Sequence, residues 1–248
     1  MSRRFGQGND VDRNRPHLFH RDYWPLSIIA EQVLAFVQRH EAEMRLGPTL
    51  DYGAAESPYD SVFSSRGLEL IKADIGSVSP DVLPIGADGR VPLADGSVRA
   101  IISTQVLEHV PEVQAYLREA HRLLTPGGLL LLSTHGAFVL HRVPTDLRRW
   151  MIDGLRYELE SAGFKVETVV PKIGILAMSS HLRAITFGGL TRRIPFTGWL
   201  RPLIYLLFNI RMAIEDRLTP ASVMESHPEL LIACARTPAA IPAAASNG

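Results

Sequence analysis

The sequence predicts an α/β fold with a doubly wound, mainly parallel sheet and a helical insertion before the last strand. Short apolar runs that suit strands alternate with segments whose apolar residues recur at helical spacing. This alternation is typical of parallel strands joined by right-handed helical crossovers. About fifty residues separate the last two expected strands, which is unusually long for a loop in a compact domain, so this stretch is expected to form its own helices.

The composition suits a folded domain and argues against several classes of protein. Of 248 residues, 46% are hydrophobic, which is enough for a core. The 26 basic residues balance 26 acidic ones, and no nucleic-acid-binding motif is present. A lone cysteine, Cys234, and the lack of zinc-type spacing predict neither a disulfide nor a metal site. Without a signal peptide or a spanning apolar run, a soluble cytoplasmic protein is expected.

The individual elements follow from local patterns. Apolar residues at helical spacing predict a helix over 25–44. A strand over 49–52 leads into a turn of small residues at 53–55. Ser57 is then expected to cap a helix that has Pro58 at its first position. The later signals predict strands over 68–71, 98–103, 129–133, 163–170 and 229–234, a strand before residue 88, and helices from 111 to a stop at 125–128 and over 147–162.

These elements predict one domain with extensions. Residues 1–20 are polar and basic and are expected to form a flexible arm. The domain is expected to cover 21–236, with 175–226 as the helical insertion or lid. The Ala/Pro-rich tail at 237–248 is expected to be disordered.

Four groups of residues fall where a ligand would bind, because open α/β sheets bind ligands beyond the carboxyl ends of their strands. They are the turn 51–57, Asp74, Asp88 with Gly89, and the segment 104–109. Small residues in the turn allow the backbone to approach a ligand, and a carboxylate such as Asp74 can accept both hydroxyls of a ribose. Each group also has a structural interpretation as a tight connection, a cap or a buried histidine.

An NAD site is the competing interpretation, since Asp74 suits the ribose of that cofactor too. The dinucleotide fingerprint requires glycines where this chain has Gly53, Ala55 and Pro58. Only the first of these is glycine, so NAD is disfavoured.

Taken together, several segments resemble one family. They are 50–59, 73–75, 86–93, 95–97, 104–110 and 124–128. Together they resemble the class I S-adenosylmethionine-dependent methyltransferases, specifically the methyltransferase type 11-like group. The resemblance covers about residues 25–175 and 229–236, and the segment 105–110 followed by 125–128 is its most specific part.

The resemblance implies S-adenosyl-L-methionine as the cofactor. It places Asp51 and Gly53 at the methionine amino group, Asp74 at the ribose and Asp88 at the adenine amine. The cofactor-binding set implied in this way is Asp51, Tyr52, Gly53, Ala55, Asp74, Asp88, Gly89 and Gln105. The chain departs from the family at Ala55, where glycine is usual and a methyl group would crowd the cofactor, and at Arg99, where aspartate is common.

On the acceptor side, the resemblance makes His109 the candidate catalytic base. Methyl transfer is an in-line displacement that depends on alignment, and a base helps when the acceptor is a hydroxyl or a protonated amine. The loop after the strand 129–133 adds four candidate substrate contacts, His135, His141, Asp146 and Arg149. Asp146 is equally well explained as a cap of the next helix.

The insertion leaves three interpretations open. Residues 176–214 contain five arginines and no acidic residue, with aromatic residues interleaved. Such helices could form a lid, lie on an anionic membrane surface, or cap the sheet edge. The expected function is methyl transfer to a small-molecule or glycan-like acceptor. The alternative is a catalytically silent binding protein with this fold, associated with a membrane surface through the insertion.

Overall fold

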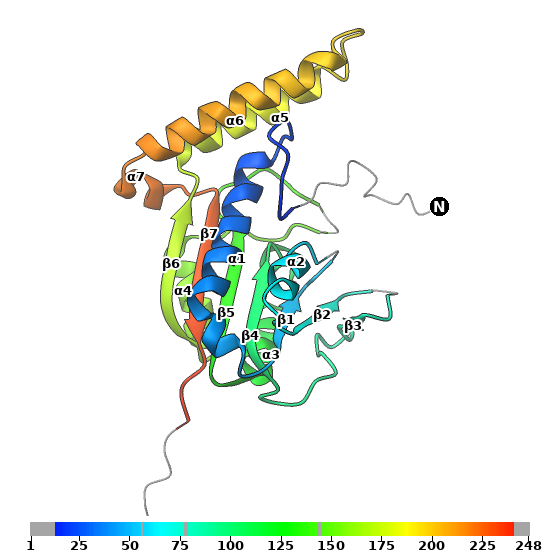
Figure 1. Cartoon of the computed structure of the whole chain (residues 1–248). Helices are drawn as coiled ribbons and strands as arrows, with labels where there is room; N and C mark the ends of the chain where they lie inside the picture. Colours follow the sequence, from blue (N-terminus) through cyan, green and yellow to red (C-terminus); the bar gives the residue numbers. More distant parts are fainter. Residues whose placement is uncertain (1–12, 56, 77–78, 143–144, 241–248) are drawn as a thin grey trace, which may run out of the picture.

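Seven strands form one sheet in the computed structural model of the chain, which describes residues 13–55, 57–76, 79–142 and 145–240. Across the sheet the order is β3 (Val82–Pro84), β2 (Leu70–Asp74), β1 (Thr49–Tyr52), β4 (Val98–Thr104), β5 (Leu124–His135), β7 (Leu230–Arg236) and β6 (Lys165–Lys172). All neighbours are parallel except that β7 runs antiparallel to β5 and β6 (Figure 1). The predicted doubly wound, mainly parallel sheet is confirmed.

Helices cover both faces of this sheet. They are α1 (Tyr23–Met44), α2 (Asp60–Ser64), α3 (Val113–Leu123), α4 (Ile152–Ser161), α5 (Ile175–Leu190), α6 (Arg201–Leu218) and α7 (Ala221–Ser226). Along β5, Leu129 and Leu131 pack in the cluster that contains α1 and α2, whereas Leu130 and Leu132 pack with α3 and α4. A continuous apolar run therefore serves as a strand buried on both faces.

The chain reverses its direction of travel across the sheet at β1, which pairs with β2 on one side and β4 on the other. In such folds the crevice at this reversal, beyond the carboxyl ends of the strands, is where ligands bind. Asp51 and Tyr52 end β1, and Thr104 ends β4. The fold therefore brings the predicted cofactor residues to one edge.

The helix expected to start at Ser57 starts instead at Asp60, so the predicted cap is wrong. Ser57 has a φ of 49°, in the left-handed region, and its hydroxyl donates to Oδ2 of Asp51 over 3.0 Å. The hydroxyl that the pattern assigned to the helix start is used to hold a buried carboxylate. The short α2 has no side-chain cap.

Two further boundaries differ from the predictions. The strand expected at 129 begins at Leu124, which pairs with Val98 before a register shift. The helix expected at 147 begins at Ile152, because hydrogen bonds hold the preceding residues to the site. The amide of Leu147 donates to the carbonyl of Glu108 over 2.9 Å, and that of Trp150 donates to the carbonyl of His135 over 3.1 Å.

The insertion before β7 is helical, as predicted. Helices α5 and α6 form a hairpin that lies across the carboxyl end of the sheet and projects beyond it (Figure 1). The side-chain amide of Asn209 on α6 donates to the carbonyls of Leu18 and His20, over 2.8 and 2.9 Å. Part of the segment expected to be a flexible arm is thus bonded to the hairpin, while residues 1–12 and 241–248 lie outside the described residues.

A buried ionic cluster joins the hairpin to the rest of the domain. His181 on α5 contacts Glu229, just before β7, over 2.8 Å and Asp22, just before α1, over 3.1 Å. Burial by itself would lower the pKa of His181, but the two carboxylates outweigh it and raise the pKa to about 9. The histidine is therefore a cation held between two carboxylates at neutral pH.

Arg99 has a structural role at the opposite, amino-terminal edge of the sheet. Its guanidinium lies 2.7 Å from a carboxylate oxygen of Glu43, which also receives Arg236 over 2.8 Å. Hydrogen bonds from Arg236 hold the pKa of Glu43 down at about 2. The departure from the family pattern at Arg99 therefore provides an ion pair that lies away from the predicted site.

None of the helices in the described part of the chain has the length and apolar character needed to cross a bilayer.

Candidate active site

The turn after β1 is held tightly against its neighbours. Gly53 has a φ of +87°, and a Cβ there would lie 2.5 Å from Cγ2 of Val106, so no other residue fits without displacement. The amides of Gly53 and Ala54 both donate to the carbonyl of Ala73, over 2.9 and 3.0 Å. The turn is thereby fixed between β2 and the segment after β4.

Asp74 ties this turn to the end of β2. Its Oδ2 accepts the amide of Ala55 and its Oδ1 accepts the amide of Ile75, both over 2.6 Å. Each carboxylate oxygen has a further lone pair, and the residue is partly exposed. Asp74 thus holds the turn to the end of β2, and its carboxylate can still accept ligand hydroxyls.

Asp51 lies behind the turn as a buried carboxyl, 2% exposed. Burial raises the pKa of Asp51 to about 7, and the charge of nearby Asp74 adds to this effect, against the lowering hydrogen bond from Ser57. A carboxylate stripped of water in this way has a strong affinity for a cation. An ammonium group of a ligand would supply one.

Gln105 directly after β4 is held in a conformation that residues other than glycine rarely adopt, with a φ of 56°. Its amide nitrogen donates to Oγ of Ser133 over 3.1 Å. Its Oε1 is buried and has no hydrogen-bond partner among the described residues. This buried oxygen can accept a hydrogen bond from a ligand that carries a donor group.

The other three cofactor candidates have different surroundings. The Tyr52 side chain is fully buried, stacked on Tyr116 with ring centroids 4.2 Å apart, and its hydroxyl donates to the carbonyl of Gly89 over 3.2 Å. Tyr52 is thus a core residue that supports the turn at Gly89. Asp88 is exposed and accepts the amide of Arg90, and no contact links its carboxylate to Asp51 or Asp74 among the contacts of the described residues.

His109, the candidate base, lies one short turn beyond Gln105. Its Nδ1 contacts the carbonyl oxygen of Thr145 and must donate to it, because a carbonyl only accepts. In the neutral ring the lone pair is therefore on Nε2, which lies 3.9 Å from Oε1 of Glu108. The imidazole is oriented as a proton acceptor.

Glu108 is the residue that the sequence analysis did not single out. It is 0% exposed, and Thr134 donates to its Oε2 over 2.9 Å. Its Oε1 has no hydrogen-bond partner within the described part of the chain, and it lies 3.6 Å from Nε2 of His135. Burial raises the pKa of Glu108. The only sequence signal was a charged residue next to His109 in an otherwise apolar turn.

Two further predicted histidines gather at the same place. His135 and His141 have ring centroids 6.2 Å apart, and His141 lies 6.1 Å from His109. Burial, reinforced by the charge of Arg149, lowers the pKa of His135 to about 3, so this ring is neutral. Phe138 stacks on His135 at 4.7 Å and reaches His181 of the hairpin at 5.3 Å.

Asp146 and Arg149 pair with each other and brace the loop after β5. Asp146 accepts the amide of His141 over 2.6 Å, and Arg149 donates to Asp146 and to the carbonyls of Phe138 and Val139. The interpretation of Asp146 as a helix cap is wrong, because α4 begins after Met151 without a side-chain cap. The donors of Arg149 are engaged inside the loop, which they hold in shape.

Comparisons with known proteins agree with this geometry. The family model described as a methyltransferase domain matches residues 50–132. A probable S-adenosylmethionine-dependent methyltransferase of Mycolicibacterium smegmatis is 29% identical over 160 residues, covering 60% of this chain and 62% of that protein. The malonyl-[acyl-carrier protein] O-methyltransferase 1 of Coxiella burnetii is 35% identical over 91 residues, covering 37% and 30%. Through residues 50–132 the chain is similar to the methyltransferase domain, and both relatives are named as methyltransferases.

Solved structures similar to this chain agree on the fold. A putative sarcosine dimethylglycine methyltransferase from Galdieria sulphuraria has a TM-score of 0.55 at 13% identity, covering 87% of this chain and 89% of that one. The [4+2]-cyclase SpnF has a TM-score of 0.53 at 19% identity, covering 85% and 82%. The chain spans less than two thirds of the length of the two curated relatives described above.

The residues at the strand ends fit S-adenosyl-L-methionine, the cofactor of the proteins that the chain resembles. The buried carboxyl of Asp51 suits the amino group of the methionine portion, and the unpartnered Oε1 of Gln105 can accept a hydrogen bond from the same portion. The part-exposed Asp74 suits the ribose. The fit rests on this chemistry of the donors and acceptors at the strand ends.

Ala55, where glycine is usual in the methyltransferase family, is strained. Its φ of 45° is left-handed, which costs a residue with a Cβ about 1–2 kcal/mol. We expect Ala55→Gly to leave the turn unchanged and to raise the melting temperature by one or two degrees, because the relieved strain exceeds the added chain entropy. Thermal melts check this, with Ala87→Gly in the exposed turn before Asp88 as control. A lower melting temperature in Ala55→Gly than in the control would contradict it.

Proposed function

We propose that this protein transfers a methyl group from S-adenosyl-L-methionine to a small-molecule or glycan-like acceptor. The observation that carries the proposal is the pairing of Asp51 and Asp74 through one turn, in which Ser57 bonds to the first and Ala55 to the second. This arrangement offers one buried and one part-exposed carboxylate at the ends of β1 and β2, at the edge of the sheet where Gln105 and His109 follow β4. The cofactor, when bound, supplies an electrophilic methyl group attached to its own leaving group.

The residues of the chain would act chiefly by alignment, since in-line displacement requires the acceptor atom and the methyl group to be held in register. Asp51, Asp74 and Gln105 would fix the cofactor at the ends of β1, β2 and β4. The loop braced by Asp146 and Arg149 would hold the acceptor opposite. Cytoplasmic location, which suits the free Cys234, is part of the same proposal.

His109 is the proposed base for a hydroxyl acceptor. With Nδ1 donating to Thr145, its Nε2 can take the acceptor proton as the new bond forms. Neighbouring Glu108 and His135 would then be positioning residues, since Glu108 lies between Nε2 of His109 and Nε2 of His135. His141 is the exposed member of the group and is placed to contact the acceptor.

A thermal melt with and without S-adenosylhomocysteine tests the cofactor assignment, with NAD as the control ligand. At a hundredfold excess over Kd a ligand adds about 2.7 kcal/mol to the free energy of unfolding. In a chain of this size we expect the melting temperature to rise by roughly 5–10 °C. A rise with NAD alone, or no rise at millimolar S-adenosylhomocysteine, would overturn the proposal in favour of a silent binding protein.

The raised pKa of Asp51 leads to a second prediction about the proposed cofactor site. Below pH 7 the free protein carries a protonated Asp51, whereas pairing with an ammonium group requires the ionised form. Binding must therefore release a proton, and we expect the affinity for S-adenosylhomocysteine to fall about tenfold between pH 8 and pH 6. Calorimetry across this range measures the change. Asp51→Asn should bind weakly and without this pH dependence; a flat profile in the unaltered protein would remove Asp51 from the amino group.

A further inference from the structure

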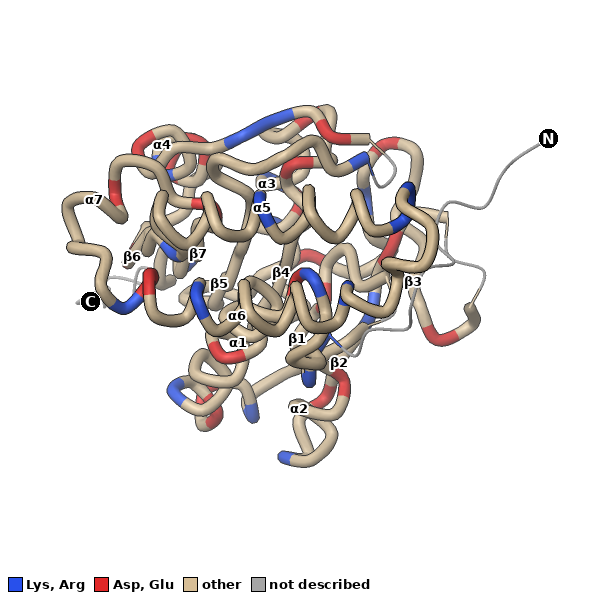
Figure 2. Tube along the Cα trace, turned by 90° about the horizontal axis from the view of Figure 1, so that it is seen from above, with Lys and Arg blue, Asp and Glu red and all other residues tan. Residues whose placement is uncertain are grey.

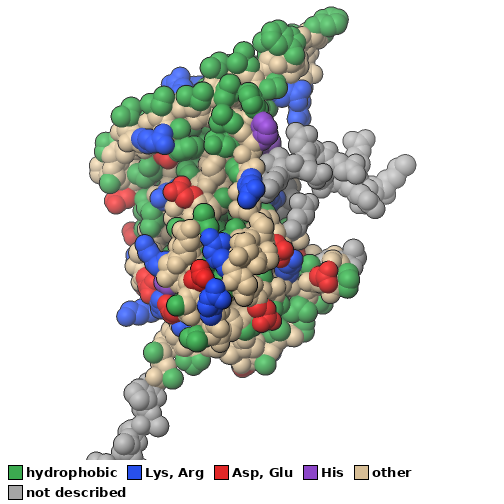
Figure 3. Space-filling view, in the orientation of Figure 1, with side chains coloured by type: hydrophobic (Ala, Val, Ile, Leu, Met, Phe, Trp, Pro, Cys, Tyr) green, Lys and Arg blue, Asp and Glu red, His purple; other side chains and the backbone are tan. Residues whose placement is uncertain are grey.

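The hairpin of α5 and α6 presents an apolar face that no other described element covers. On α6 the exposed large side chains are Leu203, Leu207, Ile210, Ile214 and Leu218. Their spacing of three or four residues places them on one stripe of the helix. Phe187 and Leu190 extend this face on α5. Figure 3 shows hydrophobic side chains gathered along this edge of the molecule, over both helices.

The tip of the hairpin is the most exposed apolar part of the protein. Phe196 is 96% exposed and Trp199 is 73% exposed, and Ile194 beside them is exposed too. The tip projects past the sheet, so these side chains have no surface of the domain to pack against (Figure 1). Single exposed hydrophobic residues are common, but a projecting aromatic tip continuous with an apolar helix face marks an interaction surface.

The charge of the hairpin indicates what it contacts. Five arginines and no acidic residue lie between Leu176 and Ile214, and Arg183, Arg192 and Arg193 are exposed. Seen from above, the hairpin carries basic residues along α5 and at the tip (Figure 2).

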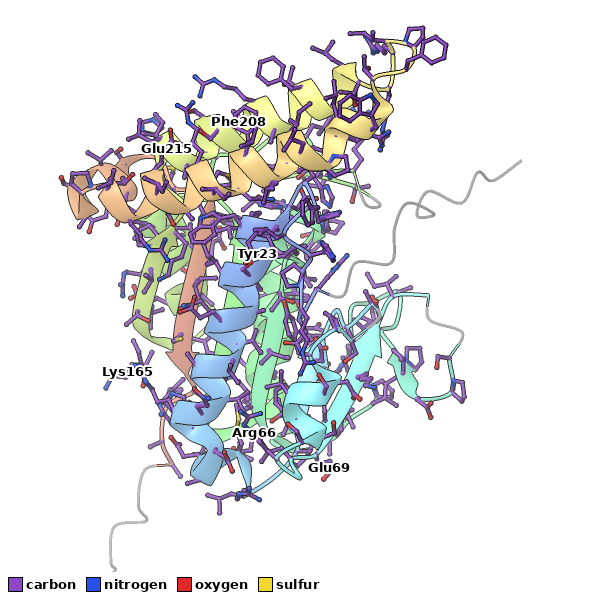
Figure 4. All side chains as sticks on the ribbon, turned by 45° about the horizontal axis from the view of Figure 1, so that its top comes forward. Tyr23, Arg66, Glu69, Lys165, Phe208 and Glu215 are labelled. Carbon is purple, nitrogen blue, oxygen red and sulfur yellow. The ribbon has the colours of Figure 1, made fainter. Side chains whose placement is uncertain are left out.

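The first acidic residues after this basic stretch are engaged within the fold. Glu215 accepts Ser180 and Arg211, and Asp216 accepts the amide of Gly174 and the indole of Trp24. Figure 4 marks Glu215 and Phe208 on the hairpin, where Phe208 stacks against Phe187 between the two helices.

We propose that this hairpin face docks on the surface of an anionic phospholipid bilayer. Apolar side chains and tryptophan favour the boundary between headgroups and acyl chains, and exposed arginines pair with lipid phosphates. Symmetric pairing of two copies through the same face would bring the arginines of both together without exposed carboxylates between them. The face therefore suits an anionic, partly apolar partner better than itself. This inference does not depend on methyl transfer.

Docking in this way would place the acceptor side near the bilayer. The hairpin lies over the carboxyl end of the sheet, and His181 on α5 is 5.3 Å from Phe138, which stacks on His135. The predicted acceptor histidines therefore lie on the same side of the domain as the docking face.

Vesicle flotation of the full chain tests the proposal. We expect the protein to float with vesicles of phosphatidylcholine mixed with phosphatidylglycerol, to float poorly with phosphatidylcholine alone, and to be released by salt. The fluorescence of Trp199 should shift to shorter wavelength with the mixed vesicles, and Trp199→Phe should remove most of that shift. The double variant Phe196→Ser with Trp199→Ser should lower the bound fraction about tenfold.

Matched variants distinguish specific binding to anionic lipid from non-specific adsorption and from loss of folding. Arg192→Gln with Arg193→Gln should weaken binding to the mixed vesicles specifically. Leu46→Ser, at a site that is 77% exposed on the far side of the domain, should bind like the unaltered protein. The same melting temperature in all variants confirms that they are folded. Absence of flotation, equal flotation with both vesicle types, or a concentration-dependent dimer that the tip variant converts to a monomer would overturn the proposal.

Discussion

His181→Leu is expected to lower the free energy of unfolding by about 3–5 kcal/mol, because it leaves Glu229 buried without the cation that it faces. Glu229 is wholly enclosed, and no other cation contacts it in the described part of the chain. Chemical denaturation measures the loss. His227→Leu, at an exposed histidine two residues before Glu229, is the matched control and should change stability by less than about 0.5 kcal/mol.

The pH dependence of this loss in stability shows whether His181 acts through its charge or through packing. Folding raises the pKa of His181 from its ordinary value of about 6.5 to about 9. The contribution of its charge to the free energy of unfolding is therefore complete below about pH 6.5 and is lost as pH rises through about 9. The difference between the unaltered protein and His181→Leu should therefore be largest near pH 6 and shrink toward pH 10. A difference that stays constant over this range would mean that His181 acts by filling space.

Asp74→Asn is expected to raise the Kd for S-adenosylhomocysteine about 10- to 100-fold, since charge-assisted hydrogen bonds contribute roughly 1.5–3 kcal/mol. The substitution retains one oxygen that can accept from Ala55 or Ile75, so the turn should persist and the loss should reflect the ligand. Isothermal titration measures the affinity. Asp81→Asn, an exposed carboxylate in the connection to β3, is the control and should bind normally.

An unchanged affinity in Asp74→Asn would remove this residue from the ribose. A fall in melting temperature without ligand, larger than that of Asp81→Asn, would instead assign Asp74 to the stability of the turn. The two readouts together separate the ligand role from the structural one.

The sequence predicts the elements whose signals are local. The apolar run 129–132 alternates between two cores and could only be a strand buried on both faces. Gly53 was recognisable because a tight turn after a strand requires a residue without Cβ, and the structure places it against Val106. The resemblance to a family then assigned Asp74 to the ribose, and the structure shows it bonded to that turn.

The rest depends on contacts that the local sequence patterns do not reveal. Ser57 has the local signature of a helix cap, yet Asp51 lies close enough in the fold to take its hydroxyl. Glu108 gains its importance from His135 and Thr134, which arrive from a different strand. The contacts of Glu108 with His135 and Thr134 cannot be predicted from spacing along the chain, because they depend on the register between β4 and β5.

The position of β7 has a consequence for how the protein is made. This strand separates β5 from β6 and bonds to both, so β6 has no neighbour in the sheet until residues 230–236 have left the ribosome. During synthesis the strands β1 to β5 can assemble first, while β6 emerges without a strand to pair with. The nascent chain therefore exposes the open edge of β5 and the unpaired β6 together, and both need protection from aggregation until the final strand arrives.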